Sequence, residues 1–285
     1  MAFDFRRSLG KVLPLKSLRD PAPVVPVVRL SGVIGQVGPL RSGLTFESVR
    51  DPLERAFRVK RAKAVALAIN SPGGSPVQSA LIARHIRELA DEKEIRVLAF
   101  IEDAGASGGY WLASAADEIF VDPSSIVGSI GVISAGFGFP ALLERLGVER
   151  RVETAGERKA LLDPFQPRRE ADVAHLRTLL EELHEAFKEQ VRSRREGRLT
   201  APEEELFTGE FWGGQRAVDL GLADGIGHLH SELRRRFGKK VIVYRIQRPR
   251  RWLSWRTAQT AAPREWAEAA IAALEERAYW SRYGL

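Results

Sequence analysis

The chain of 285 residues contains no cysteine and a single methionine. Without cysteine it can form no disulfide, hold no metal through thiolates and use no cysteine nucleophile. It has no run of about 18 apolar residues, so the sequence predicts no membrane-spanning helix. Residues 1–20 are basic in part, but they lack the continuous apolar stretch and the small-residue cleavage site of a secretory signal. We therefore expect a cytoplasmic protein without a transmembrane segment or signal peptide.

Acidic residues are outnumbered, with 37 Asp and Glu against 44 Lys and Arg, and the formal net charge is +7. The basic excess gathers in 6–19, 191–198 and 234–256. No zinc-finger spacing or aromatic RNA-binding pattern accompanies it, so we expect no nucleic-acid partner. Trp252 and Trp255 beside arginines, and the apolar residues interleaved with basic ones in 3–19, favour peripheral contact with the inner face of a membrane. A solvated basic face or arm is the alternative.

Hydrophobic periodicity divides most of the chain into alternating strands and helices. Such alternation predicts an α/β fold with parallel strand pairing. Buried strands are predicted over 27–35, 62–70, 95–102 and 118–123, a glycine-rich strand over 128–139, and a further strand over 148–156. Helices are predicted over 45–59, 75–94, 109–118, 140–147, 169–196 and 211–227, the last with Gly221 as its C-cap. The simplest division is a basic N-terminal arm (1–23), one catalytic domain (24–246) and a basic, Trp-containing C-terminal extension with a helix (247–285).

Three glycine-bearing turns follow successive predicted strands: NSPGG (70–74), AGASGGYW (104–111) and GSIGV (128–132). The carboxyl ends of parallel strands share one edge of a sheet, where ligands bind. None of the turns is a phosphate loop, because the pattern G-x-x-x-x-G-K-[ST] is absent. The amides of Gly73 and Gly74 are unobstructed by side chains, which suits the approach of a carbonyl oxygen. Taken alone, NSPGG is better explained as a tight turn. Two such turns at the ends of neighbouring strands favour an oxyanion hole more strongly.

Ser107 lies between a predicted strand and a predicted helix, beside the amides of Gly108 and Gly109. Two interpretations are open. The hydroxyl either caps the helix, or it is a nucleophile whose oxyanion is held by the amide that follows it.

A serine nucleophile needs a base, and histidine is the usual one. None of the five histidines follows a turn suited to an active site. Lys159 follows a predicted strand and precedes the apolar stretch ALLDPF. An ordinary lysine has a pKa of ~10.4, and burial lowers the pKa of a lysine by up to roughly 3–5. A lysine base therefore requires a dry environment, and Lys159 considered alone reads as a surface residue.

In combination the motifs resemble the signal peptide peptidase A family (SppA or protease IV, with SohB-type relatives), whose fold is related to ClpP and the crotonases. The matching stretches are NSPGG, GASGGYW with the following AS, AD and GSIGV, then G..KA..DPF, and FTGE followed by RAVDLGLADGIG. They extend over about residues 25–230.

The resemblance implies repeated β-β-α units, with a mainly parallel sheet flanked by helices. It also implies a serine endopeptidase for extended or unfolded peptides, including signal peptide remnants, that works through an acyl-enzyme without metal or cofactor. Ser107 would be the nucleophile, Lys159 the general base, and Ser129 the residue that orients the lysine amine. Gly108, with Gly73 or Gly74, would form the oxyanion hole. The family further implies a homo-oligomeric ring or dome in which Ser107 of one copy meets Lys159 of its neighbour.

Three other interpretations use the same fold. A crotonase-type acyl-CoA enzyme would need carboxylates as acid–base groups. A ClpP-like Ser-His-Asp peptidase would need a histidine base, and this sequence has none between residues 85 and 175. A non-catalytic oligomeric binding protein would have no use for Ser107, Lys159 and Ser129 together.

Overall fold

The computed structural model describes residues 21–36, 43–156, 158–246, 273–274 and 277–285. Its strands form one sheet in the order β6-β5-β3-β2-β1-β8, with β4 beside β3 and β7 beside β4. Every pair is parallel except β5 with β6. The strands are β1 (Val24–Ser31), β2 (Val65–Ser71), β3 (Val97–Ala106), β4 (Glu118–Val121), β5 (Ile126–Gly128), β6 (Phe211–Gly213), β7 (Gly225–Ile226) and β8 (Ile242–Arg245). The predicted α/β fold with a mainly parallel sheet is confirmed.

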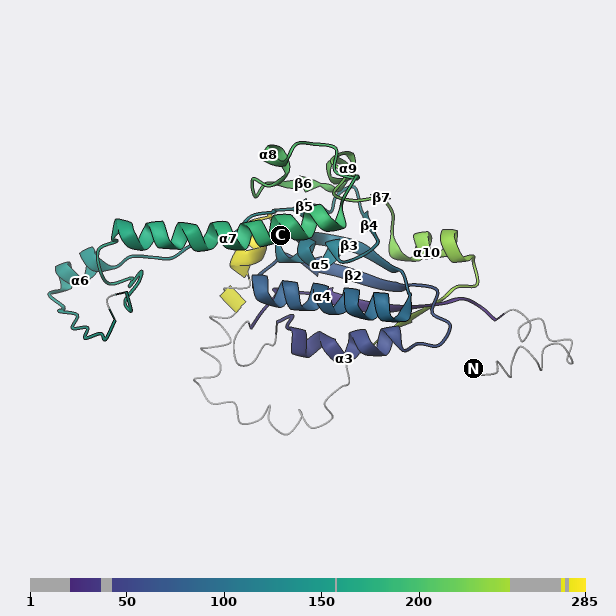
Figure 1. Cartoon of the computed structure of the whole chain (residues 1–285), viewed down its shortest axis with the longest axis horizontal. Coiled ribbons are helices and arrows are strands. Elements are labelled where there is room, and N and C mark those ends of the chain that lie inside the picture. Colours follow the sequence, from purple (N-terminus) through teal and green to yellow (C-terminus); the bar gives the residue numbers. More distant parts are fainter. Residues whose placement is uncertain (1–20, 37–42, 157, 247–272, 275–276) are drawn as a thin grey trace, which may run out of the picture.

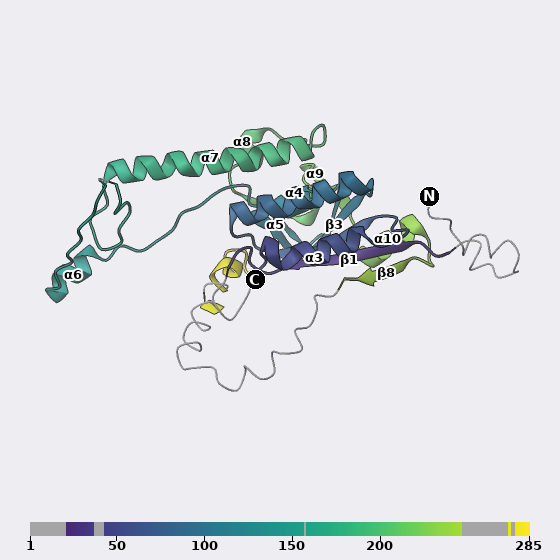
Figure 2. The ribbon, with the colours of Figure 1, turned by 60° about the horizontal axis from the view of Figure 1, so that its bottom comes forward.

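Helices lie on both sides of this sheet (Figures 1 and 2). They are α3 (Phe46–Phe57), α4 (Pro76–Lys93), α5 (Gly108–Ser114), α6 (Pro140–Leu146), α7 (Glu170–Arg194), α8 (Glu203–Leu206), α9 (Gly214–Asp219) and α10 (Leu229–Phe237). Side-chain hydrogen bonds cap the N-termini of two of these helices. The Thr45 side chain accepts from the Ser48 amide before α3, and Ser75 Oγ accepts from the Gln78 amide before α4.

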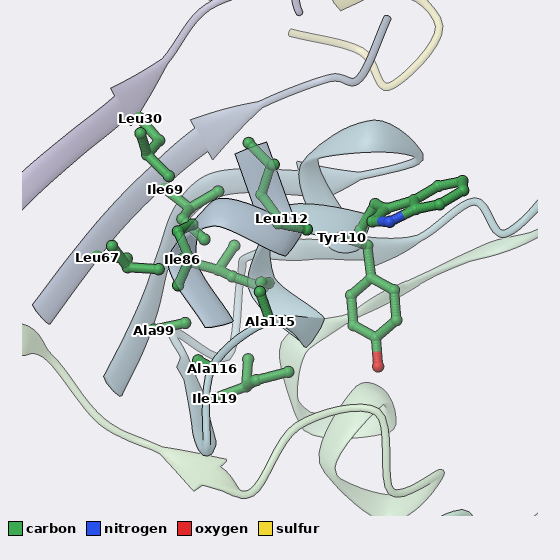
Figure 3. Close-up of a cluster of buried hydrophobic side chains, with 14 of the residues drawn as sticks. Leu30, Leu67, Ile69, Ile86, Ala99, Tyr110, Leu112, Ala115, Ala116 and Ile119 are labelled. Carbon is green, nitrogen blue, oxygen red and sulfur yellow. The ribbon is translucent and has the colours of Figure 1, made fainter. Parts of the chain in front are cut away.

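The central strands are buried on both faces, as expected of a parallel sheet. Alternate residues of β1 belong to different clusters: Val28 and Leu30 face α3, α4 and α5, whereas Val25 and Val27 face α10. Figure 3 shows the first cluster, in which Leu30 and residues of β2 and β3 pack against helical side chains. We infer that these two clusters supply most of the hydrophobic stabilisation of the fold.

The strand register brings the ends of four strands together. Ser71 of β2 pairs with Gly105 of β3, and Ala106 pairs with Gly128 of β5. Ser31, the last residue of β1, pairs with Asn70. The three glycine-bearing turns therefore lie at one edge of the sheet, as the sequence predicted.

Two strand predictions are wrong. The glycine-rich strand predicted over 128–139 ends at Gly128, because Gly128 (φ 105) and Ser129 (φ 53) turn the chain out of extended conformation. The segment 148–156 is exposed and irregular, since no strand among the described residues completes its hydrogen bonds. The helix predicted over 211–227 divides into β6, α9 and β7, and Gly221 with φ 75 follows the end of α9.

A projecting arm is built from residues 132–168, which include α6, together with the first half of α7. It extends away from the sheet in both ribbon views (Figures 1 and 2). None of the described helices combines the length and apolar character needed to cross a membrane.

Candidate active site

Ser107 occupies the turn between β3 and α5 in a strained conformation, with φ 52 and ψ −122. Its amide donates to the Gly128 carbonyl (2.8 Å), and its carbonyl accepts from the Trp111 amide (3.0 Å). The backbone is thus fixed from both sides. Unlike Ser75 at the start of α4, Ser107 makes no capping hydrogen bond with its side chain. The N-cap interpretation is therefore wrong, and the hydroxyl is left for another role.

The turn after β2 packs directly against Ser107. A Cβ added to Gly73 would lie 2.7 Å from Ser107 Cβ and 3.0 Å from the Gly108 nitrogen. Gly73 has φ 103 and Gly74 φ 141, conformations that favour glycine. A Cβ on Gly109 would lie 2.4 Å from the Ser71 carbonyl oxygen. Only glycine permits the two turns to approach so closely.

The amides near Ser107 differ in their hydrogen bonding. The Gly73 amide donates to Ser71 Oγ (3.2 Å), and Ser71 Oγ itself donates to the Gly32 carbonyl (2.7 Å). Ser71 is fully buried, so this second serine holds the turn together. The amides of Gly74 and Gly108 have no hydrogen-bond partner in the described part of the chain. Both residues line the cavity beside Ser107, which leaves two N–H groups able to bind an oxyanion.

The cavity beside Ser107 has a volume of about 1060 Å³. Trp111 and Phe187, stacked with ring centroids 4.7 Å apart, line it together with the segments 33–36 and 131–135. Arg282 is its one charged residue, and its described lining contains no His, Lys, Asp or Glu. Among the described residues, the cavity therefore offers Ser107 no imidazole, carboxylate or lysine amine as a general base.

Ser129 lines the same cavity and is held by its backbone, whose amide donates to the Glu210 carbonyl (2.6 Å). The Tyr283 hydroxyl lies 3.2 Å from Ser129 Oγ and 3.3 Å from the Pro72 carbonyl, and it can donate to either. Tyr283 comes from the end of the chain, and its ring packs edge-on against Phe211.

Sequence reasoning missed this contribution of the C-terminal residues. Tyr279, Arg282 and Tyr283 all line the cavity, and Tyr279 packs against Val33. The spacing of the two tyrosines, four residues apart, indicates one face of a helix. That spacing could have predicted a packed segment, but not the surface it packs against.

Lys159 does not line the cavity that contains the other predicted site residues. It is exposed, and its amide donates to the Gly156 carbonyl (3.1 Å). It belongs to the segment between α6 and α7, which in both views lies beyond the sheet at the outer end of α7 (Figures 1 and 2). The single chain thus brings together Ser107, Ser129, Gly108 and the Gly73–Gly74 turn, and leaves Lys159 apart.

The projecting arm contacts itself through a few specific interactions. The Phe139 amide donates to the Pro164 carbonyl (2.6 Å), the Phe139 and Phe165 rings lie 5.5 Å apart, and Arg150 pairs with Asp163 (2.9 Å). No residue of α6 is buried. Large apolar side chains are exposed along the arm, namely Ile133, Phe137, Leu142, Leu146 and Val148, the phenylalanine at 84%. Several large apolar side chains exposed in one arm are typical of an interaction surface.

Comparison with known proteins identifies relatives of the chain. Residues 90–240, more than half of the sequence, match the family model of peptidase family S49. The matched range includes Ser107, Ser129 and Lys159. The chloroplastic serine protease SPPA of Arabidopsis thaliana is 29% identical over 237 residues, which are 79% of this chain and 35% of that protein.

A protein of Brucella abortus named Na(+)/H(+) antiporter NhaA is 50% identical over 291 residues, which cover 97% of this chain and 39% of that protein. The chain thus spans about two fifths or less of both relatives, and the antiporter name carries no function over to it. Among solved structures, a serine-to-alanine mutant of the 1510-N membrane-bound stomatin-specific protease matches with a TM-score of 0.49 and 15% identity. That match covers 80% of this chain and 99% of the other.

Proposed function

The chain belongs to peptidase family S49, and from this premise we propose that it is a serine endopeptidase whose active site is completed by a second copy of itself. Ser107 is the nucleophile, and Lys159 of a neighbouring copy is the general base. The observation that carries the proposal is the incomplete cavity. Its described lining holds a serine with an uncommitted hydroxyl and two free amides, but no histidine, lysine or carboxylate.

The chemistry is acyl transfer. Ser107 Oγ attacks the peptide carbonyl carbon while a neutral lysine amine accepts the hydroxyl proton. The tetrahedral oxyanion accepts hydrogen bonds from the amides of Gly74 and Gly108. Of Gly73 and Gly74, Gly74 is the better donor to the oxyanion, because its amide is free whereas the Gly73 amide already donates to Ser71 Oγ. As the C–N bond breaks, the ammonium group returns its proton to the leaving amine. Water then hydrolyses the ester bond of the acyl-enzyme, which releases the acyl product and restores the Ser107 hydroxyl.

The arm supports assembly with other copies. A helix without buried residues gains little from its own chain, since most helices depend on tertiary packing. A neighbouring copy would cover the exposed apolar residues of the arm. The same contact would carry Lys159 into a cavity with apolar walls, where removal from water favours the neutral amine. Ser129 Oγ is available there to hold the amine. A head-to-tail contact of this kind closes naturally into a ring or dome.

The substrate we infer is an extended peptide, including signal peptide remnants. An enclosed assembly would admit an unfolded chain and exclude a folded protein. The cavity extends along 131–135 and 33–36, and its apolar wall of Trp111 and Phe187 suits apolar side chains of the substrate.

A fluorophosphonate probe tests the nucleophile directly. We expect a single adduct on Ser107 by peptide mapping of the assembled protein, and none in Ser107→Ala. Ser71→Ala should still be labelled, since Ser71 is buried and bonded to Gly32. An adduct on Ser71, or labelling that survives in Ser107→Ala, would exclude Ser107 as the nucleophile.

Gly73→Ala should reduce kcat more than about tenfold, because the new Cβ displaces Ser107 or the Gly108 amide, and misplacement of about 1 Å costs up to about a hundredfold. The matched control is Gly32→Ala. Gly32 has a nearly equal φ of 102, but its added Cβ meets nothing within 4 Å. Chemical unfolding should show a loss of stability in both variants from the positive φ, and a larger one in Gly73→Ala, where the added Cβ also clashes. Steady-state kinetics should show a large loss of kcat only in Gly73→Ala. Equal kcat values in the two variants would contradict the proposed role of the close approach.

Tyr283→Phe should raise kcat/KM by roughly fivefold, the equivalent of one net hydrogen bond of about 1 kcal/mol. The Tyr283 hydroxyl contacts Ser129 Oγ, which the lysine amine must also reach. Tyr279→Phe is the control, because it removes a hydroxyl with no hydrogen-bond partner among the described residues. A fall in kcat/KM for Tyr283→Phe would show instead that this hydroxyl assists catalysis.

A further inference from the structure

Lysines gather at the edge of the sheet opposite the cavity, where the parallel strands begin. Val24 of β1 pairs with Ile242 of β8, and the Pro23 carbonyl accepts from the Ile242 amide (2.8 Å). The Val24 carbonyl accepts from the Lys63 amide (3.0 Å). These bonds join the segment before β2 to the segment before β8. The lysine edge that results contains Lys60, Lys63, Lys239 and Lys240.

The charges of the lysine edge are not neutralised by neighbouring acids. All four side chains are exposed, and none has a hydrogen-bond or ion-pair partner among the described residues. The stretches 58–63 (RVKRAK) and 238–241 (GKKV) contain no acidic residue. Arg236 on nearby α10 differs, because Glu118 and Glu232 both bind it. The lysine edge is therefore a concentrated positive surface available to an outside partner.

Apolar side chains lie beside these charges on β8, an outer strand of the sheet. Val241 and Val243 pack into the core cluster that faces α10. The alternate residues Ile242 and Tyr244 point the other way and are 51% and 50% exposed. An aromatic and an aliphatic side chain next to ammonium groups suit the interface of a membrane, where lipid phosphates and acyl chains meet. Nucleic acid would use the charges but not Ile242.

The lysine edge thus offers four ammonium groups without ion pairs among the described residues, beside one exposed aliphatic and one exposed aromatic side chain. We propose that the lysine edge binds an anionic lipid surface, with Ile242 and Tyr244 reaching into the headgroup region.

This orientation has a consequence for substrate access. Ser107 and its cavity lie at the carboxyl ends of the strands, and the lysine edge lies at their amino ends. The eight residues of β1 separate the two by roughly 26 Å at about 3.3 Å per residue. Docking through the lysine edge would hold the protein on the membrane with its cavity directed into the aqueous phase.

Vesicle sedimentation with the full chain tests the proposal. We expect binding to phosphatidylglycerol–phosphatidylcholine vesicles, little binding to phosphatidylcholine alone, and weaker binding as salt rises. Replacing the four lysines of the edge with glutamine should weaken binding by about a hundredfold or more, at about fivefold for each lysine. The control removes the same charge from exposed positions outside the lysine edge, the cavity and the projecting arm, by replacing Arg29, Arg50, Arg84 and Arg216 with glutamine. It should change affinity less than about threefold. Ile242→Ser should abolish the binding that persists at high salt.

Hydrolysis of a soluble peptide is measured in parallel, so that failure of the membrane proposal can be distinguished from failure of the proposed function. Both glutamine variants should retain wild-type turnover, because neither touches the cavity. Equal loss of vesicle binding in the two variants would overturn the proposal, as would wild-type binding by the lysine variant. Lysine-dependent binding of an oligonucleotide without binding to vesicles would overturn it in favour of nucleic acid.

Discussion

Replacing Ser107 with alanine is expected to lower kcat/KM for peptide hydrolysis by about 10⁴-fold or more, because removal of a serine nucleophile leaves only the oxyanion donors and substrate binding. The fold should be unaffected. The Ser107 side chain makes no capping bond, and its backbone is held by Gly128 and Trp111. We therefore expect the free energy of unfolding to change by less than about 1 kcal/mol.

Ser134→Ala is the matched control for this change. Ser134 lines the same cavity and is exposed, but it lies outside the close contact between the two glycine turns. Its substitution should leave kcat/KM within about threefold of wild type, as expected of a surface position. Substantial turnover by Ser107→Ala, with a correctly folded protein, would exclude the acyl-enzyme mechanism proposed for this site.

Lys159→Ala is expected to reduce kcat by about 10³-fold, within the range of about 10²–10⁴ for loss of a general base. Lys159→Arg should not restore activity, since a guanidinium stays protonated at any working pH. Arg158→Ala removes a neighbouring cation of the same exposed segment and should leave turnover nearly unchanged. An active Lys159→Arg enzyme would show that charge, rather than proton transfer, is what this position supplies.

The pH dependence of the wild type should carry the signature of an amine base. Only the neutral amine accepts a proton, so kcat/KM should rise with pH and level off once the amine is neutral. We expect this rise within the working pH range, because the assembled site would remove the amine from water and so favour its neutral form. A rate independent of pH between about 6 and 9 would rule out lysine as the base.

The sequence predicted the arrangement around Ser107 because that arrangement depends on local features. Short apolar runs define β2 and β3, and glycines at 73, 74, 108 and 109 permit the close approach of the turns that follow them. Parallel pairing then places both turns at the same edge. The sequence also predicts the Ser75 cap of α4, since a serine directly precedes the periodic apolar residues of that helix.

Features that depend on distant parts of the chain could not be predicted in the same way. The segment 148–156 has the residue pattern of a strand, but strand formation needs a partner strand, and the described part of the chain does not provide one. The contact of Tyr283 with Ser129 joins residues far apart in sequence, and no local pattern specifies it. In the proposed assembly a neighbouring copy brings Lys159 to Ser107, a placement that no local pattern of the sequence specifies. The lysine edge likewise arises only when Val24 is paired with Ile242.

Subunit mixing tests the central claim, that the catalytic pair forms between copies. Ser107→Ala and Lys159→Ala chains are dissociated together and reassembled, with a different tag on each so that mixed assemblies can be isolated. If the pair forms between copies, about a quarter of the interfaces in an equal mixture regain both residues, and peptidase activity returns to about that fraction of wild type. If each pair lies within one chain, every site lacks one member. Confirmed mixed assemblies without activity at any ratio would contradict the account.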